Sequence, residues 1–298
     1  MITALQNLLR ITYAPAMLLV FTGSAIAMID AGLPHPWLIG LLIVAIIVSL
    51  LAERAVPYEQ SWNHSHNDSA RDLAHALVNE ASAFAGVLAL PWLTTLLPWS
   101  GIWPSQWPIG MQLLMAVLIA DCGITLMHWL SHRWPVLWRF HAVHHSVTRF
   151  YGFNGLLKHP LHQLIETAAG TTPLILLGMS QDIAALLAFA IGLQLLLQHS
   201  NVDMRIGALR HLLALAPVHR FHHRKWAGVG DVNFGLFTTL WDRLLKTAVF
   251  EPQARFGPGD FGIGNQPDYP RDYLGQLLQP FRRQPVADPA SDGNSASP

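Results

Sequence analysis

Apolar residues along this chain gather in helix-sized blocks that short polar turns separate. The blocks cover residues 11–29, 37–52, 76–98, 109–130 and 163–199, the last interrupted near 177–182. A bilayer crossing needs about 20 predominantly apolar residues in a helix. Each shorter block alone is compatible with a buried core helix, but five in one chain favour membrane spans, the last a helical hairpin. The pattern predicts an all-α fold: a polytopic membrane helix bundle.

Basic residues are distributed unevenly between the two ends of the predicted spans. If the N-terminus lies inside, the outer turns are residues 31–36, 99–108 and 177–182, and none of them contains Lys or Arg. Because positive charge resists translocation, this asymmetry predicts cytoplasmic long loops and a cytoplasmic C-terminus. We expect a cytoplasmic helical cap from residues 131–162 and 200–275.

Three tryptophans lie in the predicted outer turn or at its edges, where amphipathic indole rings favour the headgroup region. They are Trp99, Trp103 and Trp107. The first apolar block has an alternative reading as a cleavable signal peptide, since it combines Arg10 with "AIA" at 25–27. The further hydrophobic spans favour a retained helix, and cleavage would leave the orientation of the later spans unchanged.

Composition supports a lipid-facing surface. Hydrophobic residues make up 52% of the chain and charged residues 12%, against roughly 25% charged in soluble domains. The mean hydropathy is +0.33, and the zero formal net charge implies no nucleic-acid partner. Cys122 is the single cysteine, which excludes a disulfide framework, a thiolate zinc site and an iron–sulfur cluster held by the chain's own thiolates.

The sixteen histidines carry the chemical signal. Two motifs share the spacing H-x-x-H-H, "HAVHH" at 141–145 and "HRFHH" at 219–223, and "HWLSH" at 128–132 ends the fourth span. On a helix, positions i, i+3 and i+4 share one face. With His159 before the hairpin and His199 at its inner end, ten histidines reach one membrane face. They are His128, His132, His141, His144, His145, His159, His199, His219, His222 and His223.

A metal site explains this accumulation best. Burying three imidazoles on one helical face is costly unless a cation or other partners satisfy their nitrogens. Ten candidates exceed the three or four protein ligands of one zinc site, so we expect two metals. Imidazole suits iron, zinc, copper and nickel, and thiolate-free ligation with an open position favours non-haem iron that activates oxygen. Five further histidines are interpreted as capping, interfacial or solvated residues: His35, His64, His66, His75 and His211.

The three histidine motifs, in this order, resemble those of the fatty acid hydroxylase superfamily, also called the sterol desaturase family. The resemblance includes "FNGLLKHPLHQL", "LQHSNV" and "DVNFGLFTTLWDRLLKT" and covers roughly residues 115–250. It implies an integral membrane di-iron oxygenase that uses O2 and external electrons to hydroxylate or desaturate a lipid. The resemblance implies that nine of the ten histidines above are ligands. His159 is a candidate tenth ligand.

The chain departs from the family pattern at His162, where relatives often have an acidic residue. Glu166, one helical turn further, is the candidate substitute, so both residues are possible outer partners of the ligands. Asp231 and Asn233 are candidates to orient ligands by hydrogen bonds, with a turn cap as the alternative role. On this basis the chain divides into N-terminal transmembrane helices (1–108), a hydroxylase-like catalytic region (109–250) and a partly disordered cytoplasmic tail (251–298).

The predicted function is that of a membrane-bound oxygenase with two iron ions, acting on a sterol, a fatty acyl chain or another membrane lipid. The sequence contains no cysteine cluster, no G-x-G-x-x-G motif and no recognisable haem domain. A separate electron donor is therefore expected: a reductase, a ferredoxin or a cytochrome. Two alternatives stay open, a zinc-dependent membrane hydrolase and a non-catalytic lipid-binding relative.

Overall fold

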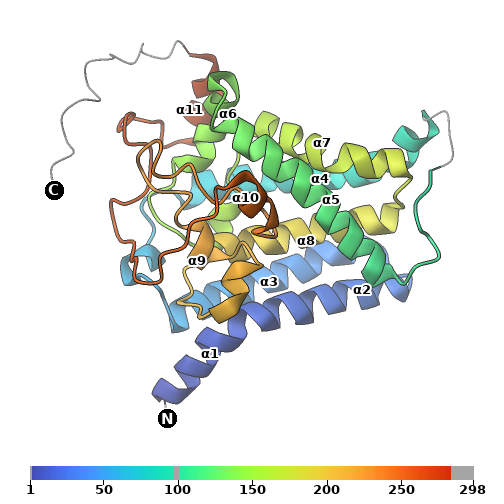
Figure 1. Cartoon of the computed structure of the whole chain (residues 1–298), viewed down its shortest axis with the longest axis horizontal. Coiled ribbons are helices and arrows are strands. Elements are labelled where there is room, and N and C mark those ends of the chain that lie inside the picture. Colours follow the sequence, from blue (N-terminus) through green and yellow to red (C-terminus); the bar gives the residue numbers. More distant parts are fainter. Residues whose placement is uncertain (1, 97–100, 283–298) are drawn as a thin grey trace.

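The computed structural model describes residues 2–96 and 101–282, and within these ranges the chain forms helices and isolated β-bridges but no strand (Figure 1). The α-helices are α1 (Ile2–Ala16), α2 (Thr22–Asp30), α3 (Pro36–Ala55), α4 (Ser69–Thr95), α5 (Ile109–Ser131), α6 (Pro135–His145), α7 (Pro160–Leu177), α8 (Gln181–His199), α9 (Ala216–His219), α10 (Leu240–Leu245) and α11 (Tyr273–Leu278). Shorter or irregular helical segments are η1 (Met17–Phe21), η2 (Gln60–Asn63), η3 (Gly152–Leu156), η4 (Gly207–His211) and η5 (Gln279–Phe281).

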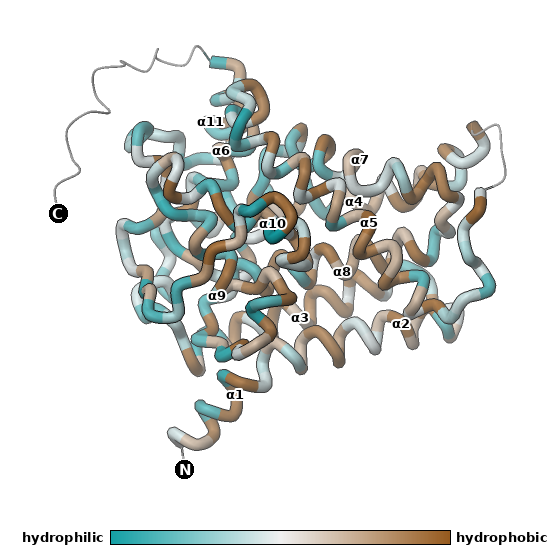
Figure 2. Tube along the Cα trace, viewed as in Figure 1, coloured by the Kyte–Doolittle hydropathy of each residue, from teal (hydrophilic) through white to brown (hydrophobic). Residues whose placement is uncertain are grey.

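Five helical stretches in the described residues are long and apolar enough to cross a membrane. They are Thr3–Asp30, Pro36–Ala55, Ser69–Thr95, Ile109–Ser131 and Gln181–His199. These helices run roughly parallel, and most of the irregular, polar part of the chain gathers at one end of the bundle (Figures 1 and 2). The all-α, multi-pass fold predicted from the sequence is confirmed.

The first span is longer than its apolar block suggested. Helices α1 and α2 are joined without a break by the π-helical segment η1, which begins two residues after Pro15. Because proline lacks an amide hydrogen, it interrupts the regular α-helical hydrogen bonding, and a local change of register accommodates it. The predicted hairpin is formed by α7 and α8. It turns at Gly178, whose φ of 85° is in the left-handed region that glycine adopts easily.

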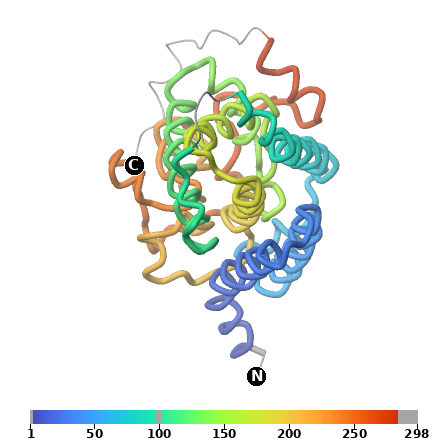
Figure 3. The backbone as a smooth tube through the Cα atoms, turned by 90° about the vertical axis from the view of Figure 1, so that its right-hand side faces the viewer, coloured from blue at the N-terminus to red at the C-terminus, as the bar shows by residue number. Residues whose placement is uncertain are grey.

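Helix α8 lies near the centre of the bundle, as the view along the helices shows (Figure 3), and 78% of its apolar window is buried. Helix α7 packs closely against α5 because glycine occupies the contact. A Cβ atom on Gly123 would lie 2.2 Å from the carbonyl oxygen of Ala169. Small residues at helix contacts allow this approach in membrane proteins. The end of α5 also meets the start of α7, where Ser131 Oγ lies 2.9 Å from His162 Nε2.

Buried carboxylates attach the cap to this bundle. Asp121 of α5 accepts hydrogen bonds from the backbone amides of residues 236–238 at 2.8–3.1 Å. Asp242 of α10 accepts from the amides of residues 234 and 235 at 2.7 and 2.8 Å. The segment after "HRFHH" is thereby fixed against α5, whose last turn carries His128.

One tryptophan does not lie where the sequence predicted. Trp103 is buried, and its indole nitrogen donates to Gln112 at 2.7 Å, so a hydrogen bond inside the protein replaces the expected contact with headgroups. Trp107 is 41% exposed, as expected for an interfacial residue. Trp99 and the tail after residue 282 lie outside the described residues.

Candidate metal centre

The structure brings nine of the ten predicted histidines together in two buried clusters. In each cluster the candidate ligand atoms lie within 4.8 Å of one another. The five-histidine cluster contains His128, His132, His141, His145 and His222. The four-histidine cluster contains His144, His199, His219 and His223.

The two H-x-x-H-H motifs are interlaced between these clusters. In "HAVHH", the outer pair His141 and His145 belongs to the five-histidine cluster and His144 to the other. The "HRFHH" motif does the reverse, because its outer pair joins the four-histidine cluster and His222 crosses to the five-histidine cluster.

The two motifs differ in local structure. "HAVHH" lies on α6 as predicted, whereas α9 ends at His219 and the rest of "HRFHH" forms a turn. The expectation that all three histidines of the second motif share a helical face is wrong. The anchoring of the following segment on α5 positions His222 and His223 instead.

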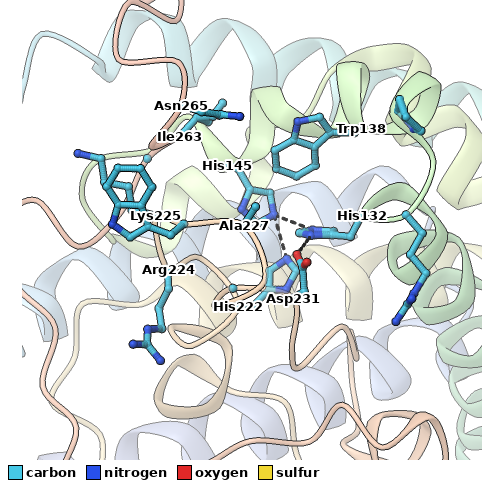
Figure 4. Close-up of a pocket in the computed structure, with 15 residues that line it drawn as sticks. His132, Trp138, His145, His222, Arg224, Lys225, Ala227, Asp231, Ile263 and Asn265 are labelled. Carbon is cyan, nitrogen blue, oxygen red and sulfur yellow. Dashed lines mark hydrogen bonds and ion pairs between the residues drawn. The ribbon is translucent and has the colours of Figure 1, made fainter. Parts of the chain in front are cut away.

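The imidazoles of His132, His145 and His222, three members of the five-histidine cluster, converge on one another (Figure 4). His145 Nε2 lies 3.0 Å from the Nε2 atoms of His141 and His222 and 3.1 Å from that of His132. Nitrogens about 2.1 Å from one ion are about 3.0 Å apart at right angles and about 3.4 Å apart in a tetrahedron. The observed spacing is that of ligands at right angles around one point.

The hydrogen bonds of two rings show why this cluster needs a cation. His128 Nδ1 lies 2.8 Å from the carbonyl oxygen of Phe234, and His222 Nδ1 lies 2.8 Å from that of Val232. A carbonyl only accepts, so both Nδ1 atoms donate and, in neutral rings, both Nε2 atoms carry lone pairs. These Nε2 atoms are 2.8 Å apart. Two lone pairs at this distance repel each other unless a positive ion lies beside them.

Burial keeps the cap histidines in the form that binds metals. Desolvation, followed by the proximity of other imidazoles, lowers the pKa of His141 and His145 far below the ordinary value. Desolvation likewise lowers the pKa of His144 to about 3. Neutral imidazole is the ligating form, so the donor set fits metal ions without prior loss of protons.

The four-histidine cluster is arranged similarly. His144 Nδ1 donates to the carbonyl of Leu157 at 2.9 Å, and His199 Nδ1 lies 3.0 Å from Asn154 Oδ1. His219 and His223 approach each other with Nε2 atoms 3.1 Å apart. His199 Nε2 is buried without a hydrogen-bond partner among the described residues. A second metal ion would satisfy that nitrogen.

His159, the tenth candidate, lies outside both clusters. It caps the start of α7, where its Nδ1 accepts from the amide of Leu161 at 3.1 Å. Its Nε2 lies 3.2 Å from the carbonyl of Leu277. Both nitrogens are therefore engaged, and the position before Pro160 is explained by helix capping.

The two proposed orienting residues have different contacts. Asp231 Oδ1 lies 2.8 Å from His132 Nδ1, and this interaction lowers the pKa of the Asp231 carboxyl. A carboxylate behind a ligating histidine fixes the ring and raises its basicity. Among the described residues, the Asn233 side chain forms no hydrogen bond with a candidate ligand. Its side chain instead bonds the backbone of Val218 and Val249, with φ of 53°, and so supports the segment before His219.

His162 and Glu166 lie behind His141. One ring nitrogen of each histidine and a Glu166 oxygen lie within 4.8 Å of one another. His162 Nε2 is 2.9 Å from Ser131 Oγ. The ammonium of Lys158 pairs with Glu166 at 2.5 Å and neutralises it, which makes a third metal ion there unfavourable. Sequence reasoning missed Lys158, although it directly precedes the highlighted His159.

A polar cavity of about 250 Å³ opens onto the five-histidine cluster. His132, His145 and His222 line it together with Asp231 and Trp138 (Figure 4). Three basic residues also line it, Arg133, Arg224 and Lys225, and the Arg224 side chain points away from the histidines. The cavity gives small molecules and polar groups a route to the cluster from the cap.

Among the remaining histidines, two have structural partners. His75 is buried between the carbonyl of Lys158 and the side chain of Gln276, at 2.9 and 3.0 Å. His35 lies 2.8 Å from Asp182 near the opposite end of the bundle.

The fold and the site define a class: a multi-pass helical membrane protein with a buried, histidine-only centre suited to two metal ions. The chain matches the family described as "Fatty acid hydroxylase" over residues 113–247. It is 35% identical over 250 residues to the ornithine lipid hydroxylase OlsE of Rhizobium tropici, covering 81% of this chain and 74% of that protein. The chain belongs to the fatty acid hydroxylase family. No solved structure matches it.

We predict that His222→Ala removes metal from the centre while His159→Ala does not. Loss of His222 deprives the five-histidine cluster of one of its ligand nitrogens, whereas the nitrogens of His159 bond the Leu161 amide and the Leu277 carbonyl, outside both clusters. Elemental analysis of purified protein should show that H222A loses about half of its metal or more and that H159A keeps the wild-type content. His211→Ala, at an exposed position, is the control. Equal metal content in H222A and wild type would contradict the assignment.

We further predict that Asp231→Ala weakens metal binding roughly tenfold to a hundredfold, because His132 loses the acceptor that orients it. Asp231→Asn retains an acceptor oxygen and should lose less. Competition with a chelator measures both affinities, and Asp268→Ala, an exposed carboxylate, serves as the control. If D231A released its metal no faster than D268A, Asp231 would have no role in orienting His132.

Proposed function

We propose that this protein is a membrane-bound di-iron oxygenase that hydroxylates a lipid. The net reaction converts a C–H group, O2, two electrons and two protons into C–OH and water. The observation that carries the proposal is the facing pair of Nε2 atoms on His128 and His222, whose Nδ1 atoms both donate to backbone carbonyls. Family membership and the hydroxylase relative support the reaction type.

Ligand number and spacing favour iron over zinc. Structural zinc takes four tetrahedral ligands, and catalytic zinc takes three protein ligands and a water. Five imidazoles with candidate ligand atoms within 4.8 Å of one another, two of them 3.0 Å from His145 Nε2, would instead suit an ion that accepts more than four ligands. Iron bound in this way supplies the oxidising power that no side chain has.

The chain's own residues hold and shield this chemistry. Backbone carbonyls and Asp231 fix the ring orientations, so little reorganisation is needed when charge changes at the centre. The four-histidine cluster is fully buried and the five-histidine cluster is open only toward the cavity beside Asp231, which limits access of bulk water and side reactions. The polar cavity beside Asp231 is the proposed route for O2 and protons.

The name of the relative suggests the first substrate to test. It is an ornithine lipid hydroxylase, so we propose an amino-acid-containing membrane lipid of this kind as the substrate, with hydroxylation in preference to desaturation. Electrons are proposed to come from a separate reductase, ferredoxin or cytochrome, because Cys122 alone cannot hold a redox cluster.

We predict that the purified protein, reconstituted in vesicles with iron, O2 and a reducing system, adds one oxygen atom to ornithine lipid. Mass spectrometry of the lipid detects the product, and omission of O2 should abolish it. Turnover of a lipid by zinc-loaded protein without O2 would support the hydrolase alternative. No turnover of any membrane lipid by fully iron-loaded protein would support the non-catalytic alternative.

The absence of Lys and Arg from the outer turns supports a cytoplasmic location of the metal centre and the C-terminus. We predict that a green fluorescent protein fused after residue 298 is fluorescent in bacterial cells, whereas an alkaline phosphatase fused there is inactive. An active phosphatase fusion would place the C-terminus and the cap on the opposite side of the membrane.

A further inference from the structure

A second cavity lies within the membrane-spanning bundle, away from the polar cavity of the cap. It occupies about 520 Å³ between α3, α4 and α8. Its walls are almost entirely apolar, with Leu42 and Ile46 from α3, Leu77 and Phe84 from α4, and Phe189 from α8. This volume is within the range of small-molecule sites, about 300–1,000 Å³. The shape and lining are those of a groove for a hydrocarbon chain.

One carboxylate interrupts this apolar lining. Glu80 of α4 is half-buried in the groove wall. No hydrogen bond and no charged group among the described residues satisfies it. Other carboxylates in the spans do have partners: Glu53 accepts from two backbone amides and Asp121 from three. An ionisable side chain within a membrane span is costly, so a missing partner inside the protein indicates a partner outside it.

The position of Glu80 along α4 defines which part of a lipid it faces. The preceding residue, Asn79, still bonds the cap, since its amide donates to the carbonyls of Leu156 and Lys158 at 3.0 Å. Glu80 lies near the middle of the part of α4 that lines the groove, between Leu73 on the cap side and Val87 toward the opposite end. The far end of the groove is at His35, near the turn between α2 and α3. A lipid in the groove would place its polar end at Glu80 and its chain toward His35.

The groove also borders the metal centre. Leu156 of η3 forms part of its wall, and the adjacent Gly155 packs so closely on α8 that an added Cβ would lie 3.3 Å from the ring of His199. Segment η3 thus separates the groove from the four-histidine cluster.

We infer that this groove binds one chain of an amine-bearing membrane lipid and that Glu80 binds its ammonium group. A carboxylate without a protein partner is complementary to a cation that also donates hydrogen bonds, and charge-assisted bonds are stronger than neutral ones. A hydroxyl offers a single neutral donor, and an anionic head would be repelled. The inference rests on the proposed function in that it identifies the substrate class as aminolipids.

The test compares two single-chain probes, octadecylamine and 1-octadecanol, which share the chain and differ in the polar end. Native mass spectrometry of the full-length protein in detergent gives the affinity for each probe. Wild type should bind the amine at least about tenfold more tightly than the alcohol. Glu80→Gln preserves the shape of the side chain and should abolish this preference without weakening alcohol binding. Asp30→Asn, an exposed carboxylate outside the groove, is the matched control and should behave as wild type.

A groove-filling variant tests the location. Ala188 of α8 lines the groove, and Ala188→Leu should weaken binding of both probes by a similar factor. An amine preference that persists in E80Q, or is absent from wild type, overturns the inference. Iron content and lipid hydroxylation are measured in parallel. Hydroxylation without a Glu80-dependent preference refutes the aminolipid site alone, whereas a Glu80-dependent preference without iron or hydroxylation refutes the proposed function alone.

Discussion

The repulsion between unprotonated imidazole nitrogens is the constraint on which the rest of the structure depends. Nine histidines lie in two buried clusters, and several donate from Nδ1 to fixed acceptors, so their lone pairs face inward. Apolar packing alone does not stabilise such an interior, because each buried polar atom without a partner destabilises the fold. Positive ions bound between these nitrogens would convert this repulsion into ligation and would join the cap to the bundle.

Buried carboxylates and one ion pair around the two histidine clusters hold the imidazoles in place. Asp121 and Asp242 fix the segment that carries the acceptors of His128 and His222, and Asp231 fixes His132. On the other side, the Lys158–Glu166 ion pair lies behind His141 and close to the start of α7. Breaking such a buried pair from one side leaves an uncompensated charge, so the network is sensitive to single substitutions. Glu80 in the groove belongs to none of these interactions, so its carboxylate is free to bind the proposed lipid ligand.

The sequence predicted the elements of the structure better than the contacts between them. Apolar blocks are local signals, and each predicted block is covered by a helix or by the α7–α8 hairpin, although the first span and α4 begin earlier than their blocks. Spacing within α6 also predicted that its histidines point to one side. The division of each motif between two clusters was not predictable, because it depends on where the turn after α9 is anchored on α5. His159 and Trp103 were misplaced because helix capping and a single internal hydrogen bond leave no periodic pattern.

The interlaced motifs have a geometric consequence. His144 and His145 are neighbours in the chain but belong to different clusters, and the same holds for His222 and His223. Consecutive Cα atoms are about 3.8 Å apart whatever the rest of the protein does. The peptide bonds between His144 and His145 and between His222 and His223 therefore fix the distance between the Cα atoms of one ligand of each cluster. A protein that docks on the cap can shift loops around the centre while the separation of the two ligand sets stays constant.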